Sequence, residues 1–160
     1  MVAKIRVKDN SVQLSKELKN IQRKFPSAIK KALANVSAFQ IVNIRTRTQR
    51  KGVDVNGSPF RPYSKAYRRR LVKQSGVVDL TDTGQMFSSL TSRITPSKGT
   101  LFFRQAQANK KAFYHDTAGA GKGKVVRPFF GINDREADKI GQLFADKIFK
   151  DIGLWALEKI

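Results

Sequence analysis

The chain has 160 residues, of which 40% are hydrophobic and 11 are phenylalanine, so it is long and apolar enough to bury one core without disulfides or metals. It has no cysteine, which excludes disulfides, thiolate catalysis and thiolate metal sites. Its 32 Lys and Arg residues against 12 acids give a net charge of +20, a balance that attracts polyanions or acidic protein surfaces.

The positive charge is concentrated in the first half of the chain. Residues 1–73 hold 19 basic and 3 acidic residues, whereas residues 74–160 hold 13 and 9. The alternative to an acidic partner is a surface that keeps the protein soluble by self-repulsion. No apolar signal core opens the chain, and no run approaches the ~20 apolar residues of a membrane span, so we expect a soluble protein made in the cytoplasm.

The first 45 residues predict an extended arm over residues 1–10 and a kinked helix over residues 11–45. Pro26 predicts the kink, or the start of a second helix, because proline cannot donate to the preceding turn. Apolar residues recur every three or four positions, which predicts one buried helix face. The members of this stripe are Leu14, Leu18, Ile21, Phe25, Ile29, Leu33, Val36 and Ile44. We interpret the stripe as core rather than as a groove for a partner.

Residues 46–66 predict a long basic loop. Gly52, Pro59 and Pro62 interrupt any periodic pattern, and Asn56-Gly57 is a tight-turn signal. Loops of this length in compact domains are usually functional or mobile.

Residues 67–132 predict short helices and an antiparallel sheet. Ile94-Thr95 on one side and the apolar residues 101–103 on the other flank the turn-forming residues 96–100, which predicts a β-hairpin. Ala106, Ala108 and Ala112 predict a short helix, and one further strand is expected before the last helix.

The final helix is predicted over residues 133–160. Asn133 followed three residues later by Glu136 is a helix-start signal, and Gly153 is a point at which the helix can break. The fold class is therefore α+β: a small antiparallel sheet packed against two long helices, with a long basic loop, in a single domain over residues 1–160.

Two short motifs stand out in the second half. In the first, residues 81–83 supply side-chain oxygens that accept from free amides at a helix start, and Gly84 allows a tight turn. Met86, Phe87 and Leu90 then fall three to four residues apart, as one buried helix face requires.

The second motif combines Tyr114-His115 with residues 127–132. Pro128 fixes its own backbone and pushes Arg127 toward an extended conformation. Residues 129–132 supply apolar bulk. Both motifs favour turns locked onto a core rather than a reactive site.

In this order and at this separation, the motifs resemble those of the phage virion morphogenesis family, the tail completion proteins of the phage Mu type. The likeness covers roughly residues 45–150 and includes a glycine-containing loop followed by spaced aromatics. The chain departs from the family pattern at residues 113–116, where the family separates the tyrosine and the histidine by small residues. The structural motif residues are Leu80, Asp82, Thr83, Gly84, Met86, Leu90, Tyr114, His115, Arg127, Phe129, Phe130 and Gly131.

The resemblance implies a structural virion protein in the tail or neck of a tailed bacteriophage or prophage, made in the bacterial cytoplasm. Such a protein completes the tail and joins it to the head as a ring-shaped homo-oligomer, with six copies as the expected number. Its implied partners are its own copies, tail tube and head–tail connector proteins and, transiently, genomic DNA, with no membrane. A ring forms when one patch of each copy meets a different patch of the next.

The candidate interaction surface combines basic and aromatic residues of the first half. Its members are Arg45, Arg47, Arg50, Lys51, Phe60, Tyr63, Lys65, Tyr67, Arg68, Arg69, Arg70 and Lys73. The same residues fit an alternative function, a basic nucleic-acid-binding domain with phosphate contacts and base stacking. The chain lacks a recognisable nucleic-acid motif, so we favour assembly and expect most of the charge to meet protein.

The residue inventory argues against an enzyme. His115 is the one histidine, so a histidine cluster for a metal is impossible, although His115-Asp116 superficially resembles the pair of metal phosphohydrolases. Residues 119–124 resemble a phosphate loop but lack the Ser or Thr that follows its lysine. Asp79 and Asp82 fit turn positions better than a carboxylate pair. We therefore expect no catalytic residues, metal or cofactor.

Overall fold

The computed structural model describes residues 11–70 and 77–154. In chain order its elements are α1 (Ser11–Arg45), η1 (Thr46–Lys51), α2 (Lys65–Arg68), α3 (Gln85–Ser88), β1 (Leu90–Ile94), β2 (Gly99–Phe103), α4 (Ala106–Phe113), η2 (Tyr114–Ala118) and α5 (Asp134–Ile152). The expected α+β class is confirmed. The expected arm over residues 1–10, Lys73 and residues 155–160 of the expected last helix lie outside the described residues.

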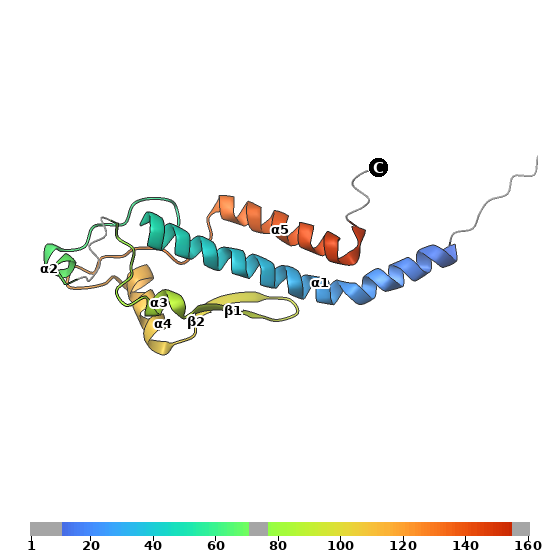
Figure 1. Ribbon diagram of the computed structural model, residues 1–160, viewed down its shortest axis with the longest axis horizontal. Coiled ribbons are helices and arrows are strands. Elements are labelled where there is room, and N and C mark those ends of the chain that lie inside the picture. The colour runs from blue at the N-terminus through green and yellow to red at the C-terminus, as the bar shows by residue number, and fades with distance from the viewer. Residues whose placement is uncertain (1–10, 71–76, 155–160) are drawn as a thin grey trace, which may run out of the picture.

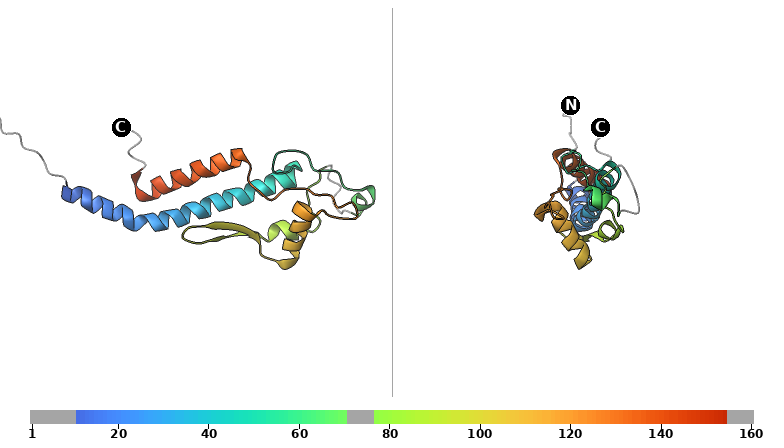
Figure 2. Two further views of the ribbon diagram at one scale, coloured as in Figure 1. Left: turned by 180° about the vertical axis from the view of Figure 1, so that it is seen from behind. Right: turned by 90° about the vertical axis from the view of Figure 1, so that its left-hand side faces the viewer.

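The long helix α1 is the central layer of the molecule. Helix α5 packs along one side of α1 in the opposite direction, and the β1–β2 hairpin with α3 and α4 lies on the other side (Figure 1). Figure 2 shows the same order of layers from behind. Pro26 lies inside α1, whose axis bends in its N-terminal half (Figure 1), as the lost backbone donor of a helix-interior proline predicts.

The sheet is the predicted hairpin. β1 pairs with β2 in antiparallel register from Leu90 opposite Phe103 to Ile94 opposite Gly99, and Thr95 N donates to Lys98 O at 2.8 Å in the turn. The further strand expected before α5 is wrong, because the described residues between η2 and α5 form only one isolated bridge, between residues 120 and 125.

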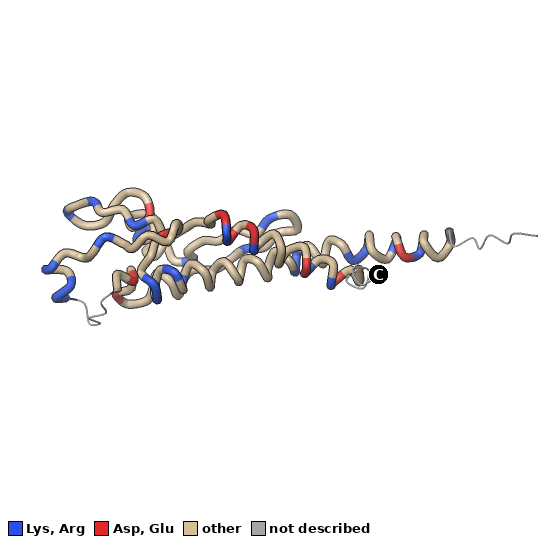
Figure 3. The backbone as a smooth tube through the Cα atoms, turned by 90° about the horizontal axis from the view of Figure 1, so that it is seen from above, with Lys and Arg blue, Asp and Glu red and all other residues tan. Residues whose placement is uncertain are grey.

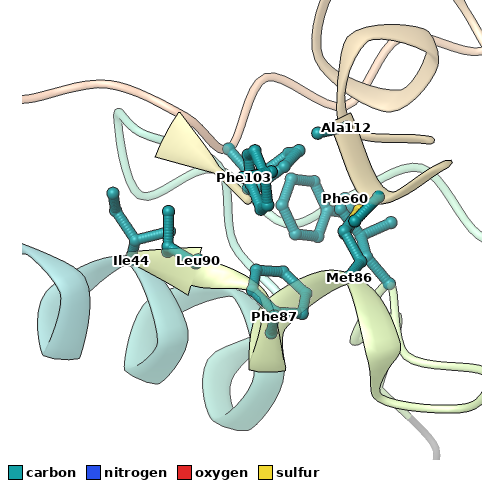
Figure 4. Packing of buried hydrophobic residues seen from close by; sticks show 10 residues of the cluster. Ile44, Phe60, Met86, Phe87, Leu90, Phe103 and Ala112 are labelled. Carbon is teal, nitrogen blue, oxygen red and sulfur yellow. The ribbon is translucent and has the colours of Figure 1, made fainter. Parts of the chain in front are cut away.

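The larger core lies between the hairpin, α4 and the C-terminal part of α1 (Figure 4). Its aromatic centre is Phe129, whose ring centroid lies 5.5 Å from that of Phe87 and 6.2 Å from that of Phe103, both edge-on. The buried members are Ile44, Phe60, Leu80, Met86, Phe87, Leu90, Phe103, Ala108, Ala112 and Phe129. The hairpin, both motifs and the spaced alanines of α4 therefore share one core.

A second, smaller core joins α1 to α5. Ala28 and Ala32 of α1 are buried against Ile148 and Ile152 of α5, and small residues on α1 let the two helices approach closely. Ile21 and Ile29 of the predicted α1 stripe are partly buried against this core, and Val36 and Ile44 are buried, as predicted. The prediction is wrong for Leu14, Leu18 and Phe25, which are exposed.

The expected loop over residues 46–66 is wrong at both ends. Residues 46–51 form η1, a π-helical turn that continues α1, and residues 65–66 already belong to α2. The chain continues as helix because Arg47 and Thr48 turn inward and are buried, which a basic, threonine-rich sequence did not indicate. Gly52 ends η1 in the left-handed region, at φ 65°.

Helix α5 begins as predicted and ends earlier than predicted. Asn133 and Glu136 form a capping box, in which Asn133 Oδ1 accepts from Glu136 N at 2.9 Å. The helix ends at Ile152 because Gly153 takes the left-handed conformation of a C-terminal cap, with φ 87°. The helix therefore does not continue unbroken to residue 160.

The turn before α3 is confirmed in one respect and corrected in another. Gly84 has the expected positive φ, 75°, and stands at the cap position of α3. Of the three expected capping side chains, Thr83 contributes, since its Oγ1 accepts from Gln85 N, the first residue of α3, at 3.5 Å. The same expectation is wrong for Thr81, whose hydroxyl donates to Asp79 O at 3.1 Å. The turn before Thr83 is held by Asp79, whose Oδ1 accepts from the backbone N two residues on at 3.0 Å.

Candidate interaction site

A buried polar network joins η1 to the start of α5. Arg47 Nη1 lies 2.6 Å from Glu136 Oε1, and Arg47 Nη2 donates to Phe129 O at 2.8 Å and to Gly131 O at 2.7 Å. Gln40 Nε2 donates to Glu136 Oε2 and to Gly131 O, both at 2.9 Å. The exposed fractions of the Arg47 and Glu136 side chains are 8% and 14%. The network therefore fixes the second motif onto α1.

Four residues of the predicted interaction surface are thus corrected. Arg47 is buried in an ion pair and Phe60 is buried in the larger core, so neither faces a partner. Arg45 is partly buried and donates to Phe87 O at 2.7 Å, and Tyr63 is also partly buried. Arg45 and Arg47 donate to backbone carbonyls inside the protein, and Phe60 fills part of the core. Residue type alone does not distinguish these roles from an exposed one.

Arg127 of the second motif holds the residues around Tyr63, which in turn contact the first motif at Leu80. Arg127 Nε donates to Arg61 O at 3.0 Å, and its guanidinium carbon lies 5.2 Å from the ring centroid of Tyr63. The Tyr63 hydroxyl in turn accepts from Leu80 N at 2.9 Å. Burial raises the pKa of Tyr63 to about 12, so the hydroxyl stays neutral.

Asp116 is a structural residue that sequence analysis missed. It lies in η2, and its Oδ1 accepts from Phe129 N at 2.9 Å and from Phe130 N at 2.8 Å. Its partners follow 13 and 14 residues later, a separation that no helix or turn signature marks. Through these two bonds, Asp116 clamps the second motif onto η2.

An Asp116→Ala variant should be less stable by about 1.5–3 kcal/mol, because a charged acceptor of two backbone donors is removed. Urea unfolding followed by circular dichroism measures the change. Asp138→Ala, an exposed carboxylate on α5, is the control and should change the free energy of unfolding by at most about 0.5 kcal/mol. Equal effects of the two variants would contradict the clamp.

A small hollow lies between the first motif, the tyrosines at 63 and 67, and the start of η2. Its volume is about 150 Å³, the size of one side chain, and the Tyr63 and Tyr67 ring centroids at its edge are 5.0 Å apart. The lining residues are Tyr63, Tyr67, Leu80, Asp82, Thr83, Gly84, Gln85, Met86, Phe87, Lys111 and His115. The hollow mixes apolar walls with tyrosine, lysine, histidine and aspartate groups, so its chemistry suits contact with a partner side chain.

The His115 side chain is partly buried. The backbone O of His115 accepts from Arg127 N at 2.7 Å. Burial, and then the positive charges of Arg127 and Lys111, lower the pKa of His115. The folded protein therefore favours the neutral imidazole.

This lowered pKa predicts a pH dependence of stability. The unfolded chain takes up a proton at His115 below its ordinary pKa of about 6.5, whereas the folded chain does so only at lower pH. The contribution of His115 is complete above about pH 6.5 and is lost as the pH falls toward the folded pKa. The free energy of unfolding of wild type minus that of His115→Gln should decrease over this interval. A constant difference would show that the histidine titrates alike in both states.

The rest of the predicted interaction surface is exposed as far as the structure describes it. Arg50 and Lys51 lie at the end of η1, and Lys65 and the arginines at 68–70 lie on or next to α2, where Tyr67 is also exposed. Lysine and arginine gather around α2 at the end of the molecule farthest from the start of α1 (Figure 3). The exposed members near α2 are Lys65, Tyr67, Arg68, Arg69 and Arg70.

The described residues hold neither a cluster of metal-binding side chains nor a membrane-spanning helix. Within residues 11–70 and 77–154, no group of three or more His, Cys, Asp or Glu side chains could hold a metal ion. No helix in the same residues combines the length and hydropathy that crossing a membrane requires.

The buried motif residues share the larger core and its hydrogen bonds, whereas Asp82, Thr83 and Tyr114 are exposed. Leu80, Met86, Leu90 and Phe129 are core, and Gly131 accepts from two side chains of the polar network. No family model matches the chain, and neither a curated protein nor a solved structure matches it. The family resemblance therefore stays an expectation that rests on the motifs.

Proposed function

We propose that this protein is a structural virion assembly protein of a tailed phage or prophage, which completes the tail and joins it to the head as a homo-oligomeric ring. The observation that carries the proposal is the use of the motif residues. They supply core residues and the clamp at Arg127, and Asp116 holds Phe129 of the second motif, so the outer surfaces are left for contacts.

The exposed surfaces support contact with other protein chains. Large apolar side chains are exposed in the N-terminal half of α1 and on α5, and contiguous exposed apolar area marks interaction sites in soluble proteins. The exposed members on these two helices include Leu14, Leu18, Phe25 and Phe149. In the proposed ring, the basic end around α2 meets acidic neighbours in the tail or the connector.

A second candidate function is nucleic-acid binding. It is favoured by the exposed Tyr67, which lies beside three consecutive arginines and could stack on a base while they contact phosphates. Salt dependence separates the two functions, since each phosphate contact contributes to the salt slope of binding.

Native mass spectrometry of nuclease-treated protein at moderate and high salt compares the two functions directly. The proposal predicts a discrete ring-sized oligomer without nucleic acid. A monomer that carries nucleic acid and releases it as the salt concentration rises would support the second candidate instead.

A further inference from the structure

The N-terminal part of α1 extends beyond α5 and beyond the hairpin (Figure 1). We call residues 12–25 the overhang. Its apolar side chains are largely exposed: Val12 by 66%, Leu14 by 56%, Leu18 by 57% and Phe25 by 42%. Leu14, Leu18 and Phe25 lie on one face of the helix, whereas Val12 lies on the opposite face. A soluble monomer seldom leaves such an apolar face uncovered.

The overhang continues an interface that exists elsewhere in the molecule. Leu14, Leu18 and Phe25 recur at spacings of four and seven residues, and the same face continues to Ala28 and Ala32, which α5 buries. The exposed part is therefore the same helix face without its covering helix. Within residues 11–70 and 77–154, Ile21 is partly buried against the smaller core, while Leu14, Leu18 and Phe25 stay exposed.

Charge and symmetry indicate which surface of a second copy fits the overhang. The overhang holds four basic residues and one acid, so two overhangs repel each other when they pair. Pairing of two overhangs also makes a closed dimer, whereas a ring requires two different patches. Helix α5 holds five of the 12 acids of the chain against four basic residues, and it is the long helix with a net negative charge.

The outer side of α5 also offers an apolar anchor. Phe149 is 44% exposed, and Asp138 and Asp146 are exposed on the same helix. Phe149 is the one large apolar side chain of α5 that is exposed. The 14 residues of the overhang span about 20 Å, which fits within the roughly 28 Å length of the 19-residue α5.

We propose that the overhang of one copy packs across the outer side of α5 of a second copy, with Leu14, Leu18 and Phe25 around Phe149. The inference rests on the proposed function in one respect, that the assembly is a ring of identical copies. Each copy then donates its overhang to one neighbour and accepts the overhang of the other, a heterologous contact that repeats until it closes.

Two surface variants test this pairing by sedimentation velocity over the micromolar range. Leu14→Glu with Leu18→Glu removes the donor surface, and Phe149→Glu removes the acceptor surface. Each should weaken self-association by about 30-fold or more, as loss of central apolar anchors does. Both should keep the wild-type far-UV circular dichroism, because all three side chains are exposed. Val42→Glu, at an exposed apolar position outside the overhang, is the control and should associate like wild type.

Mixing the two defective variants gives the sharpest outcome. The overhang variant keeps an intact α5 and the Phe149 variant keeps an intact overhang, so the mixture should form a one-to-one dimer and nothing larger. Full self-association of the Phe149 variant would mean that overhangs pair with each other and would overturn the proposal. A lower melting temperature of the overhang variant with unchanged association would assign the stripe to a contact within its own chain, which also overturns it.

The outcome also separates this inference from the proposed function. The inference is overturned if both variants associate like wild type, or if wild type stays monomeric throughout the concentration range. Neither result decides the role in virions, which is tested on virus particles. If the surfaces do pair but virions form normally without the protein, the proposed function is overturned and the pairing is retained.

Discussion

An Arg47→Ala variant should lose about 3–5 kcal/mol of its free energy of unfolding. The substitution leaves the Glu136 carboxylate partly buried without its partner, and a buried charge that loses its counterion carries a large desolvation penalty. It also removes the donor to Phe129 O and Gly131 O. Small domains are stable by about 5–15 kcal/mol, so this variant should approach unfolding under ordinary conditions. Urea titration followed by circular dichroism measures the loss.

Arg50→Ala, three residues away and exposed, is the matched control and should stay within about 0.5 kcal/mol of wild type. The double variant Arg47→Leu with Glu136→Leu should recover part of the loss, since replacing both partners removes the unpaired charge. Recovery should be incomplete because the two backbone acceptors remain without Arg47. A loss in Arg47→Ala no larger than that in Arg50→Ala would contradict the buried network.

A Phe129→Ala variant should be destabilised by a similar amount, about 3–5 kcal/mol. Phe129 is fully buried, and its ring packs on those of Phe87, Phe103 and Phe130. Truncation therefore leaves a cavity at the point where the hairpin, the first motif and the second motif meet. Chemical denaturation measures the loss.

Phe113→Ala is the control of the same chemistry at an exposed position, where only an edge contact with Tyr114 is lost. It should cost about 1 kcal/mol or less. If the Phe129 variant were as stable as the Phe113 variant, the second motif would not anchor the core, and the scaffold interpretation of the motifs would fail.

Local patterns of the sequence predicted most of the elements. The apolar spacing predicted α1 from residue 11 to residue 45, and turn-forming residues between apolar stretches predicted the hairpin. The Asn133–Glu136 pair and Gly153 marked both ends of α5. These features depend on contacts within one or two turns of the chain, which a sequence displays directly.

Long-range contacts account for the errors. Arg47 was assigned to the surface because its partner Glu136 lies 89 residues later, where no local pattern reveals the pair. Asp116 was missed for the same reason. Residues 46–51, which hold Arg47, form η1 where a loop was expected. In the candidate site, the sequence identified the exposed basic residues around α2 but not the burial of Phe60.

The stripe of α1 shows a different limit. Leu14 and Leu18 follow the same spacing as Ala28 and Ala32, yet only the latter pair is buried. Burial here depends on where α5 ends, and periodicity alone carries no information about the length of a covering helix.

The central claim is that the chain builds part of a virion, and deletion of its gene from the phage or prophage that carries it tests this most directly. Negative-stain electron microscopy of the particles produced is the measurement, with the gene supplied in trans as the control. The proposed function predicts separate filled heads and unjoined tails, with normal particles restored in the control. Intact, infectious virions from the deletion strain would contradict it.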